Sequence, residues 1–373
     1  MRFALKAAAI DPAQLADRAR RMARLELPIR LELHTFGSRD LDDPDGRRRA
    51  EAAVRTLAAA HPLTQLVVHV PYQGVADVTV RDFDADQVRR TIDFAGAVGA
   101  EAVVVHRYWG LVFGDAPPRT TREEAVAGFA LAIRDLALDA RAAGVRLWVE
   151  NIGHYSLLPR DGRHYLAGPL DHFFPWEIAA FRGALTSEGL NDTVDVFVDV
   201  AHATLSANLF NRIRACAAGR ADPRAVWITD DDLDRVARLH PFDWVDGAMP
   251  WLHLSDSRLL TEAELADPGL PAATMTEAVC AEGWEIDSGN LPWPRLAERL
   301  AAPGRDWGVD LPGAAPGVRP EPPTLLLEVE PGPGDSHVEN GAQERSLVHL
   351  AEALVGARSA GGGAGMETPG EPG

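Results

Sequence analysis

Residues 122–153, REEAVAGFALAIRDLALDARAAGVRLWVENIG, have the pattern expected of one helix followed by one strand. The segment 122–143 has the apolar periodicity of a helix. The segment 146–151 is short and apolar, as expected of a buried strand, and it ends on Glu150 and Asn151. Parallel strands need crossover helices, so this stretch predicts an α/β fold.

The same alternation runs through most of the chain. Strand-like segments occur at 2–6, 29–36, 66–71, 102–106, 146–151, 194–199, 250–254 and 324–330. Helical segments occur at 12–24, 47–60, 84–98, 122–143, 176–185, 231–239, 294–300 and 339–355. Eight alternations favour a closed (β/α)8 TIM barrel, with a doubly wound open sheet as the main rival. We expect a single barrel domain over 1–357 and a disordered tail over 358–373, which is rich in glycine.

Three connections are long, namely 154–174, 203–230 and 259–293. In barrels, long βα loops at the C-terminal face shape the substrate pocket. The stretch 303–323 is rich in proline and glycine and predicts a surface loop before the last strand.

Composition narrows the classes of function. The chain has 37 basic and 55 acidic residues and a formal net charge of -18, which disfavours nucleic acid and anionic membranes as partners. Lys6 is the single lysine, so Schiff-base and lysine general-base mechanisms are nearly excluded. The two cysteines, Cys216 and Cys280, lack metal-knuckle spacing, and no signal peptide or membrane span is evident. We therefore expect a soluble, cytoplasmic protein.

Metal-capable side chains stand at or just after the ends of nearly all the predicted strands. They are His34, His69, His106, Glu150, Asp199, His202, His253, Asp256, Glu328 and Glu330. A buried ionised carboxylate costs several kcal/mol unless it is paired or bound to a cation. Several of them at one barrel mouth make a divalent ion the simplest compensation. Oxygen and imidazole ligands suit Mn²⁺, Mg²⁺, Co²⁺ or Zn²⁺, and the sequence selects none of these.

Strand periodicity narrows the choice of inward-facing residues, because side chains at i and i+2 share a face. The pairs that can face the barrel interior are Glu32 with His34, Val67 with His69, Trp148 with Glu150, Phe197 with Asp199, Trp251 with His253, and Glu328 with Glu330. Periodicity does not separate Glu328 from Glu330. Taken singly, a strand-end histidine is more often structural than a ligand, and a strand-end carboxylate can simply cap the next helix. Tyr72, Tyr108 and Trp109 can wall a sugar pocket or pack in the core.

Taken together and in this order, several short motifs resemble the xylose-isomerase-like barrels. That family includes sugar-phosphate isomerases and epimerases, ketose 3-epimerases, hydroxypyruvate isomerases, inosose dehydratases and endonuclease IV. The motifs are HVPY at 69–72, VVVH at 103–106, VEN at 149–151, DVAH at 199–202, HLSDSR at 253–258 and GNLPW at 289–293. The resemblance extends from about residue 29 to residue 330.

The resemblance implies a ligand set of Glu150, Asp199, His253 and Glu328 around one catalytic metal. It implies that His69 and His106 contact substrate, or bind further metals as in the endonuclease branch. Endonuclease IV completes a three-zinc cluster with an Asp-x-His pair, and this chain has Glu282, Gly283 and Trp284 in that place. The missing histidine argues against a three-zinc cluster.

We therefore predict a metal-dependent isomerase or epimerase of a small sugar, sugar phosphate, polyol or hydroxy-keto acid, acting through an enediolate. Glu150 and Glu328 are the predicted proton-transfer residues, and the predicted substrate-binding residues are His69, His106, His202, Arg258 and Trp109. The alternatives are a metal-dependent dehydratase or lyase like inosose dehydratase, an endonuclease IV-like phosphodiesterase, and a catalytically silent binding protein. The expected partner is a small sugar-like molecule, and a homo-oligomer is compatible with the sequence.

Overall fold

Eight strands form a closed barrel in the computed structural model of this chain. They are β1 (Arg2–Ala8), β2 (Ile29–His34), β3 (Leu63–His69), β4 (Ala102–His106), β6 (Arg146–Glu150), β9 (Val194–Asp199), β10 (Trp251–Leu254) and β11 (Thr324–Leu327). Their order around the barrel is β1-β11-β10-β9-β6-β4-β3-β2, and each neighbouring pair is parallel. Because β1 pairs with both β2 and β11, the sheet closes, which confirms the predicted TIM barrel over the open sheet.

The structure describes residues 2–34, 41–70, 85–106, 112–113, 122–151, 156–160, 163–166, 174–221, 228–279, 281–301, 323–329 and 341–361. Among the helices within these ranges, none combines the length and apolar character needed to cross a bilayer.

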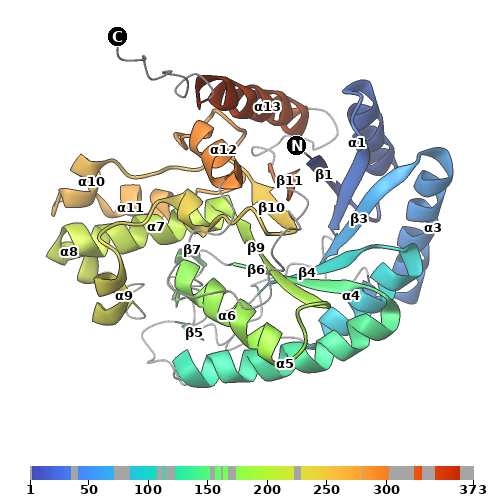
Figure 1. Ribbon diagram of the computed structural model, residues 1–373, viewed down its shortest axis with the longest axis horizontal. Helices are drawn as coiled ribbons and strands as arrows, with labels where there is room; N and C mark the ends of the chain where they lie inside the picture. Colours follow the sequence, from blue (N-terminus) through green and yellow to red (C-terminus); the bar gives the residue numbers. More distant parts are fainter. Residues whose placement is uncertain are drawn as a thin grey trace, which may run out of the picture.

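Helices form a ring outside the strands (Figure 1). The longer ones are α1 (Pro12–Arg24), α3 (Pro44–Ala60), α4 (Ala85–Val98), α5 (Arg122–Ala143), α6 (Pro175–Ser187), α7 (Val200–Ala215), α12 (Pro294–Ala301) and α13 (Ala342–Gly361). The shorter ones are α8 (Ala217–Arg220), α9 (Asp230–Arg235), η3 (Pro241–Trp244), α10 (Glu262–Ala266) and α11 (Ala272–Ala278). Helix α13 includes residues 358–361 of the expected tail, and the rest of that tail lies outside the described residues.

Helix α7 is the largest departure from the sequence analysis, which placed most of it in a long connection. It begins directly after β9, and every residue from 200 to 213 is buried. A helix shows a clear 3.6-residue pattern only when one face is polar, and α7 has no such face. The sequence of α7 therefore shows no alternation of apolar and polar residues with a helical period, although the helix is long.

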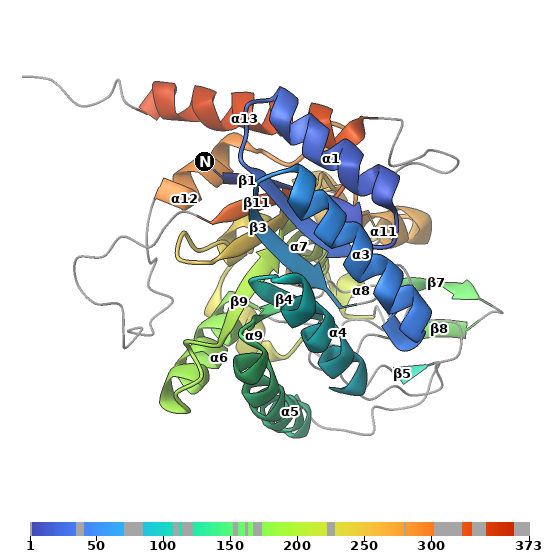
Figure 2. The same ribbon diagram turned by 90° about the vertical axis from the view of Figure 1, so that its right-hand side faces the viewer.

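Two further long connections contain strands that the apolar pattern did not reveal. Strands β5 (Val112–Phe113), β7 (Ser156–Arg160) and β8 (Arg163–Leu166) form a small antiparallel sheet in the order β5-β8-β7. In the turned view they lie apart from the barrel strands (Figure 2). The sheet joins the connection after β4 to the connection after β6.

The barrel interior has its own apolar core, separate from the core between strands and helices. It consists of Ala4, Val67, Ala102, Val104, Trp148, Phe197, Trp251 and Leu326, all with 0% exposure. The rings of Trp148 and Trp251 lie 5.5 Å apart at their centroids. Large side chains filling the interior make this a packed barrel rather than a pore, which is the arrangement typical of the fold.

We expect Trp148→Ala to destabilise the protein by about 3–5 kcal/mol, because it removes a large side chain from a closed interior that has little room to collapse. Urea unfolding followed by circular dichroism measures the difference. The control is Leu138→Ala on α5, where the side chain is 56% exposed and the expected change is within about 0.5 kcal/mol. Equal effects of the two substitutions would contradict a packed barrel interior.

Candidate metal centre

A layer of polar side chains lies next to the apolar core of the barrel, toward the C-terminal ends of the strands. Seven of its members stand two residues after a member of that apolar core: Lys6, His69, His106, Glu150, Asp199, His253 and Glu328. Since side chains at i and i+2 share a face of a strand, all seven point into the same end of the barrel. Strand β2 adds Glu32 and His34, both buried.

Glu150, at the end of β6, lies at the centre of this layer and is fully buried. Its Oε2 lies 2.9 Å from His106 Nε2 and 3.3 Å from His69 Nε2. Its Oε1 lies 3.1 Å from His253 Nδ1 and 3.5 Å from His202 Nδ1. The two oxygens of one carboxylate therefore face two different groups of histidines.

Asp199 ends β9 and caps the N-terminus of α7, where its Oδ1 accepts the His202 amide at 3.0 Å. Its backbone is fixed by Asn151, which accepts the Asp199 amide at 2.7 Å and donates to the Asp199 carbonyl at 3.2 Å. The capping role weighed from the sequence is thus present. It uses only Oδ1, and Oδ2 lies 4.0 Å from His253 Nδ1.

Histidine 253 connects the two halves of the layer. Its Nδ1 contacts Glu150 Oε1 and Glu328 Oε2, while its Nε2 lies 2.8 Å from Glu32 Oε2. Glu328 also accepts a hydrogen bond from Lys6, whose Nζ lies 3.1 Å from Glu328 Oε1. The side chains of Glu32 and His253 are 0% exposed, so this contact is shielded from water, whereas the Glu328 side chain is 18% exposed.

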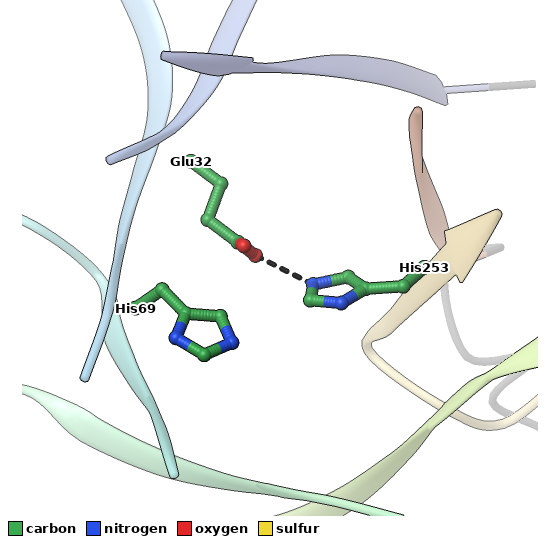
Figure 3. A group of neighbouring side chains, drawn as sticks. All are labelled: Glu32, His69 and His253. Carbon is green, nitrogen blue, oxygen red and sulfur yellow. Dashed lines mark hydrogen bonds and ion pairs between the residues drawn. The ribbon is translucent and has the colours of Figure 1, made fainter. Parts of the chain in front are cut away.

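Three groups of side chains in the described part of the chain have the proximity needed to hold an ion, with candidate ligand atoms within 4.8 Å of one another. They are Glu150–Asp199–His253–Glu328, His69–His106–Glu150 and Glu32–His69–His253. Figure 3 shows the last group, in which the three side chains converge from β2, β3 and β10. The first group is the ligand set that the family resemblance implied.

The carboxylates of this layer are held ionised by histidines. Burial opposes ionisation of Glu150, but His253 and His106 hold its pKa well below the ordinary value. Burial likewise opposes ionisation of Glu32, but His253 and His34 lower its pKa to about 2. Burial also opposes ionisation of Glu328, but His253 and Lys6 hold its pKa well below the ordinary value.

Asp199 behaves differently from these three carboxylates. Burial raises its pKa to about 7, and the attraction of His202 is opposed by repulsion from Glu328 and Glu150. Burial also disfavours a charged His202, but Asp199 and Glu282 outweigh it and raise the pKa of His202 to about 10. With a pKa near neutrality, Asp199 is only partly ionised at pH 7 when no cation is bound.

This donor set fits a divalent cation. Three carboxylates and one imidazole present converging atoms, and oxygen with nitrogen ligation suits Mn²⁺, Mg²⁺, Co²⁺ or Zn²⁺. A cation would take the place of the proton on Asp199 and offset the repulsion among the three carboxylates. The layer is thus a buried candidate metal site, and it does not distinguish among these ions.

Of the substrate-binding residues predicted from the sequence, three lie at the candidate metal site and one is engaged in ion pairs with other residues. His69, His106 and His202 all contact Glu150. The guanidinium of Arg258 is instead paired with Glu264 at 2.8 Å and with Glu277. Trp109, Tyr72, Tyr108 and Glu330 lie outside the described residues.

Four residues outside the predicted ligand and substrate-binding sets also join the cluster: Lys6, Glu32, His34 and Glu282. Glu32 was already a candidate by strand periodicity. Lys6 was set aside because it is the only lysine, but the count of a residue type says nothing about its position. Glu282 lies 3.2 Å from His202 Nε2, a contact across the loop after β10 that no local pattern indicates.

Asp256, also metal-capable by sequence, organises the loop after β10. Its oxygens accept backbone amides of Ser257, Asp287 and Leu291, and the indole of Trp293. A Cβ at Gly289 would lie 2.3 Å from the Ser257 carbonyl oxygen, so only glycine fits there. Asp256 thus has a structural role beside the metal-ligating group.

Comparisons with known proteins agree with this fold. A family model described as a xylose isomerase-like TIM barrel matches residues 31–324. Solved structures with similar folds include an L-ribulose 3-epimerase, at 12% identity and TM-score 0.51 over 98% of this chain and 100% of that chain. Another is the E. coli 3-keto-D-glucoside 4-epimerase, at 15% identity and TM-score 0.50 over 94% of this chain and 99% of that one. A D-tagatose 3-epimerase-like protein is 14% identical, with TM-score 0.49 over 96% and 99% of the two chains. No curated protein matches the sequence.

We expect the ion-free protein to lose stability as pH rises from about 6.5 to about 10. His202 binds its proton more tightly in the folded state, where its pKa is raised to about 10 from 6.5. Its contribution is therefore complete below pH 6.5 and is lost through that window, with a slope of at most about 1.4 kcal/mol per pH unit. Urea unfolding of chelator-treated wild type and His202→Gln across this range measures the difference.

His240 provides a control of opposite sign. Burial and the charge of Arg295 lower its pKa to about 4, and its Nδ1 accepts the Phe242 amide at 3.2 Å. Its contribution is present above pH 6.5 and is lost as pH falls toward 4, so His240→Gln should change only the acid side. If His202→Gln left the alkaline slope as in wild type, the assignment of a charged His202 would be wrong.

Proposed function

Because this chain belongs to the xylose isomerase-like TIM barrel family, we propose that it is a divalent-metal-dependent isomerase or epimerase. Its substrate would be a small sugar, sugar phosphate, polyol or hydroxy-keto acid. The observation that carries the proposal is the convergence of Glu150, Asp199, His253 and Glu328 at one end of the barrel interior. Members of this family include metal-dependent sugar isomerases and epimerases as well as endonucleases.

The four converging residues would hold the ion through three carboxylates and one imidazole. When bound there, a divalent ion supplies Lewis-acid polarisation of a substrate carbonyl or hydroxyl oxygen. The surrounding protein excludes water, since Glu150, Asp199 and His253 are buried. Exclusion of water strengthens every charge interaction in the site.

Glu150 and Glu328 would move the proton. Both are ionised at neutral pH, because neighbouring positive charges hold the pKa of each carboxyl well below its ordinary value. Both also contact His253 Nδ1, although they come from strands on opposite sides of β10. A carbon acid bound between the two groups can lose its proton to one carboxylate, and it can regain a proton on the opposite face once the other carboxylate has taken a proton from solvent, which inverts the stereocentre.

His69, His106 and His202 would line the substrate side of Glu150. His106 is the least enclosed of the three, and burial lowers its pKa despite the charge of Glu150. A neutral imidazole offers one donor and one acceptor, which suits hydroxyl groups of a sugar. The epimerases of similar fold indicate which sugars to test first, namely ketopentoses and 3-keto-glucosides.

A phosphodiesterase is the second candidate, favoured by the His69–His106–Glu150 group, which shares Glu150 with the first group and has the composition of a second ion site. Glu282, in the place of the acidic residue of the Asp-x-His pair, also lies 3.2 Å from His202 Nε2. Against this stand the net charge of -18 and Trp284, which occupies the position of the missing histidine. A dehydratase on the same carboxylates remains an alternative outcome of the substrate screen.

We expect purified protein supplied with Mn²⁺, Co²⁺ or Mg²⁺ to catalyse deuterium uptake from solvent into one of these sugars. Glu150→Gln keeps the shape of the side chain but removes a base and a ligand charge. Loss of a general base typically lowers rate by a factor of about 10² to 10⁴. Mass spectrometry of the sugar after incubation in D₂O measures uptake.

Glu101→Gln is the matched control, because Glu101 is an exposed residue whose carboxylate accepts from Gln65 at 2.7 Å. It should exchange at the wild-type rate. Equal exchange by Glu150→Gln and wild type would contradict the proposed base, and phosphodiester cleavage without sugar exchange would favour the second candidate.

A further inference from the structure

We infer that Lys6 and Glu32 are positioning residues that leave Glu328 and His253 with one atom each for a cation. Lys6 lies on β1 and Glu32 on β2, and neither belongs to the four-residue ligand group. The inference rests on the proposed metal site and deepens it. If Lys6 and Glu32 each occupy one atom of a ligand, they limit the coordination number of the ion.

Glu328 shows the first of these supports. Its Oε1 accepts from Lys6 Nζ at 3.1 Å, whereas its Oε2 faces His253 Nδ1. The Lys6 side chain is 6% exposed and that of Glu328 is 18% exposed, so the pair is largely shielded from solvent. A carboxylate with one oxygen held by an ammonium offers the ion a single oxygen rather than two.

The choice of lysine at position 6 has a physical reason. It is the one lysine among 37 basic residues, so arginine is used at every other basic position. An arginine presents a planar fork that engages both oxygens of a carboxylate, whereas an ammonium is a compact point charge. A lysine can therefore occupy one oxygen of Glu328 and leave the other available.

His253 shows the second support. Its Nε2 lies 2.8 Å from Glu32 Oε2, and its Nδ1 faces Glu150 and Glu328. A neutral imidazole that donates from Nε2 keeps a lone pair on Nδ1, and a carboxylate behind a ligand histidine fixes this tautomer. Glu32 is itself held by His34, whose Nε2 lies 2.8 Å from Oε1.

The other two ligands follow the same rule. Asp199 has Oδ1 engaged by the His202 amide, and Glu150 has Oε2 engaged by His69 and His106. The atoms left over are Asp199 Oδ2 and Glu150 Oε1, and both lie within 4.0 Å of His253 Nδ1. Each of the four ligands thus has one atom held by the protein and one atom facing the common centre.

This pattern assigns a role to the group in Figure 3. Glu32, His69 and His253 are close enough to suggest a second ion site. The contact between Glu32 and His253 uses the nitrogen that such an ion would need. Under this inference the group is a support for one ion rather than a second site.

Lys6→Met and Glu32→Gln test the inference through ion binding, independently of any substrate. Ion affinity and stoichiometry come from competition with a chromogenic chelator, and coordination comes from the visible spectrum of the Co²⁺-loaded protein. We expect one ion per chain in wild type and about 10- to 100-fold weaker binding in Glu32→Gln. In Lys6→Met, release of Oε1 should raise the coordination number and weaken the visible absorption bands.

Arg182→Met and Glu101→Gln are the matched controls. Arg182 forms a partly buried pair with Asp195 at 3.2 Å and with Asp246 at 3.0 Å, so its loss should lower stability without changing Co²⁺ absorption. Unchanged ion affinity and spectrum in both Lys6→Met and Glu32→Gln would overturn the inference while leaving the metal site intact. Two ions in wild type and one in Glu32→Gln would also overturn it, by making Glu32 a ligand. A wild-type protein that binds no divalent ion would refute the proposed function itself.

Discussion

Repulsion among four acidic side chains, Glu32, Glu150, Asp199 and Glu328, is the constraint on which the rest of this site depends. They are enclosed at one end of a barrel whose interior is apolar. Each ionised carboxylate in such a place costs several kcal/mol of solvation that only nearby positive charge can offset. Lys6 and a group of histidines supply positive charge near these carboxylates. Burial nevertheless raises the pKa of Asp199 to about 7.

The contacts made by these positively charged groups and by other neighbours determine which atom of each ligand faces the centre of the site. Each of the four converging ligands uses one polar atom in a contact with the rest of the protein, and the three carboxylates turn their other oxygen toward His253 Nδ1. Side chains held in this way lose little freedom when an ion binds, which is the physical meaning of a preorganised site. The polar layer rests on the closely packed side chains of Trp148, Phe197 and Trp251.

The sequence predicted those parts of the molecule that depend on short-range periodicity. Alternation within strands placed Glu150, Asp199 and His253 on inward faces, and the structure brings them together with Glu328. It could not predict α7, since a helix buried on all sides has no polar face to produce a pattern. Nor could it place Lys6 beside Glu328 or Glu282 beside His202, because such pairs join distant segments through barrel closure.

The central claim is that Glu150, Asp199, His253 and Glu328 hold one divalent ion. X-ray absorption spectroscopy of the Co²⁺-loaded protein tests it most directly, because imidazole rings give a multiple-scattering signal that counts bound histidines. The account predicts a first shell of oxygen donors with a single imidazole. Two or more imidazoles on one ion would contradict it, because the ion would then lie with His69 and His106.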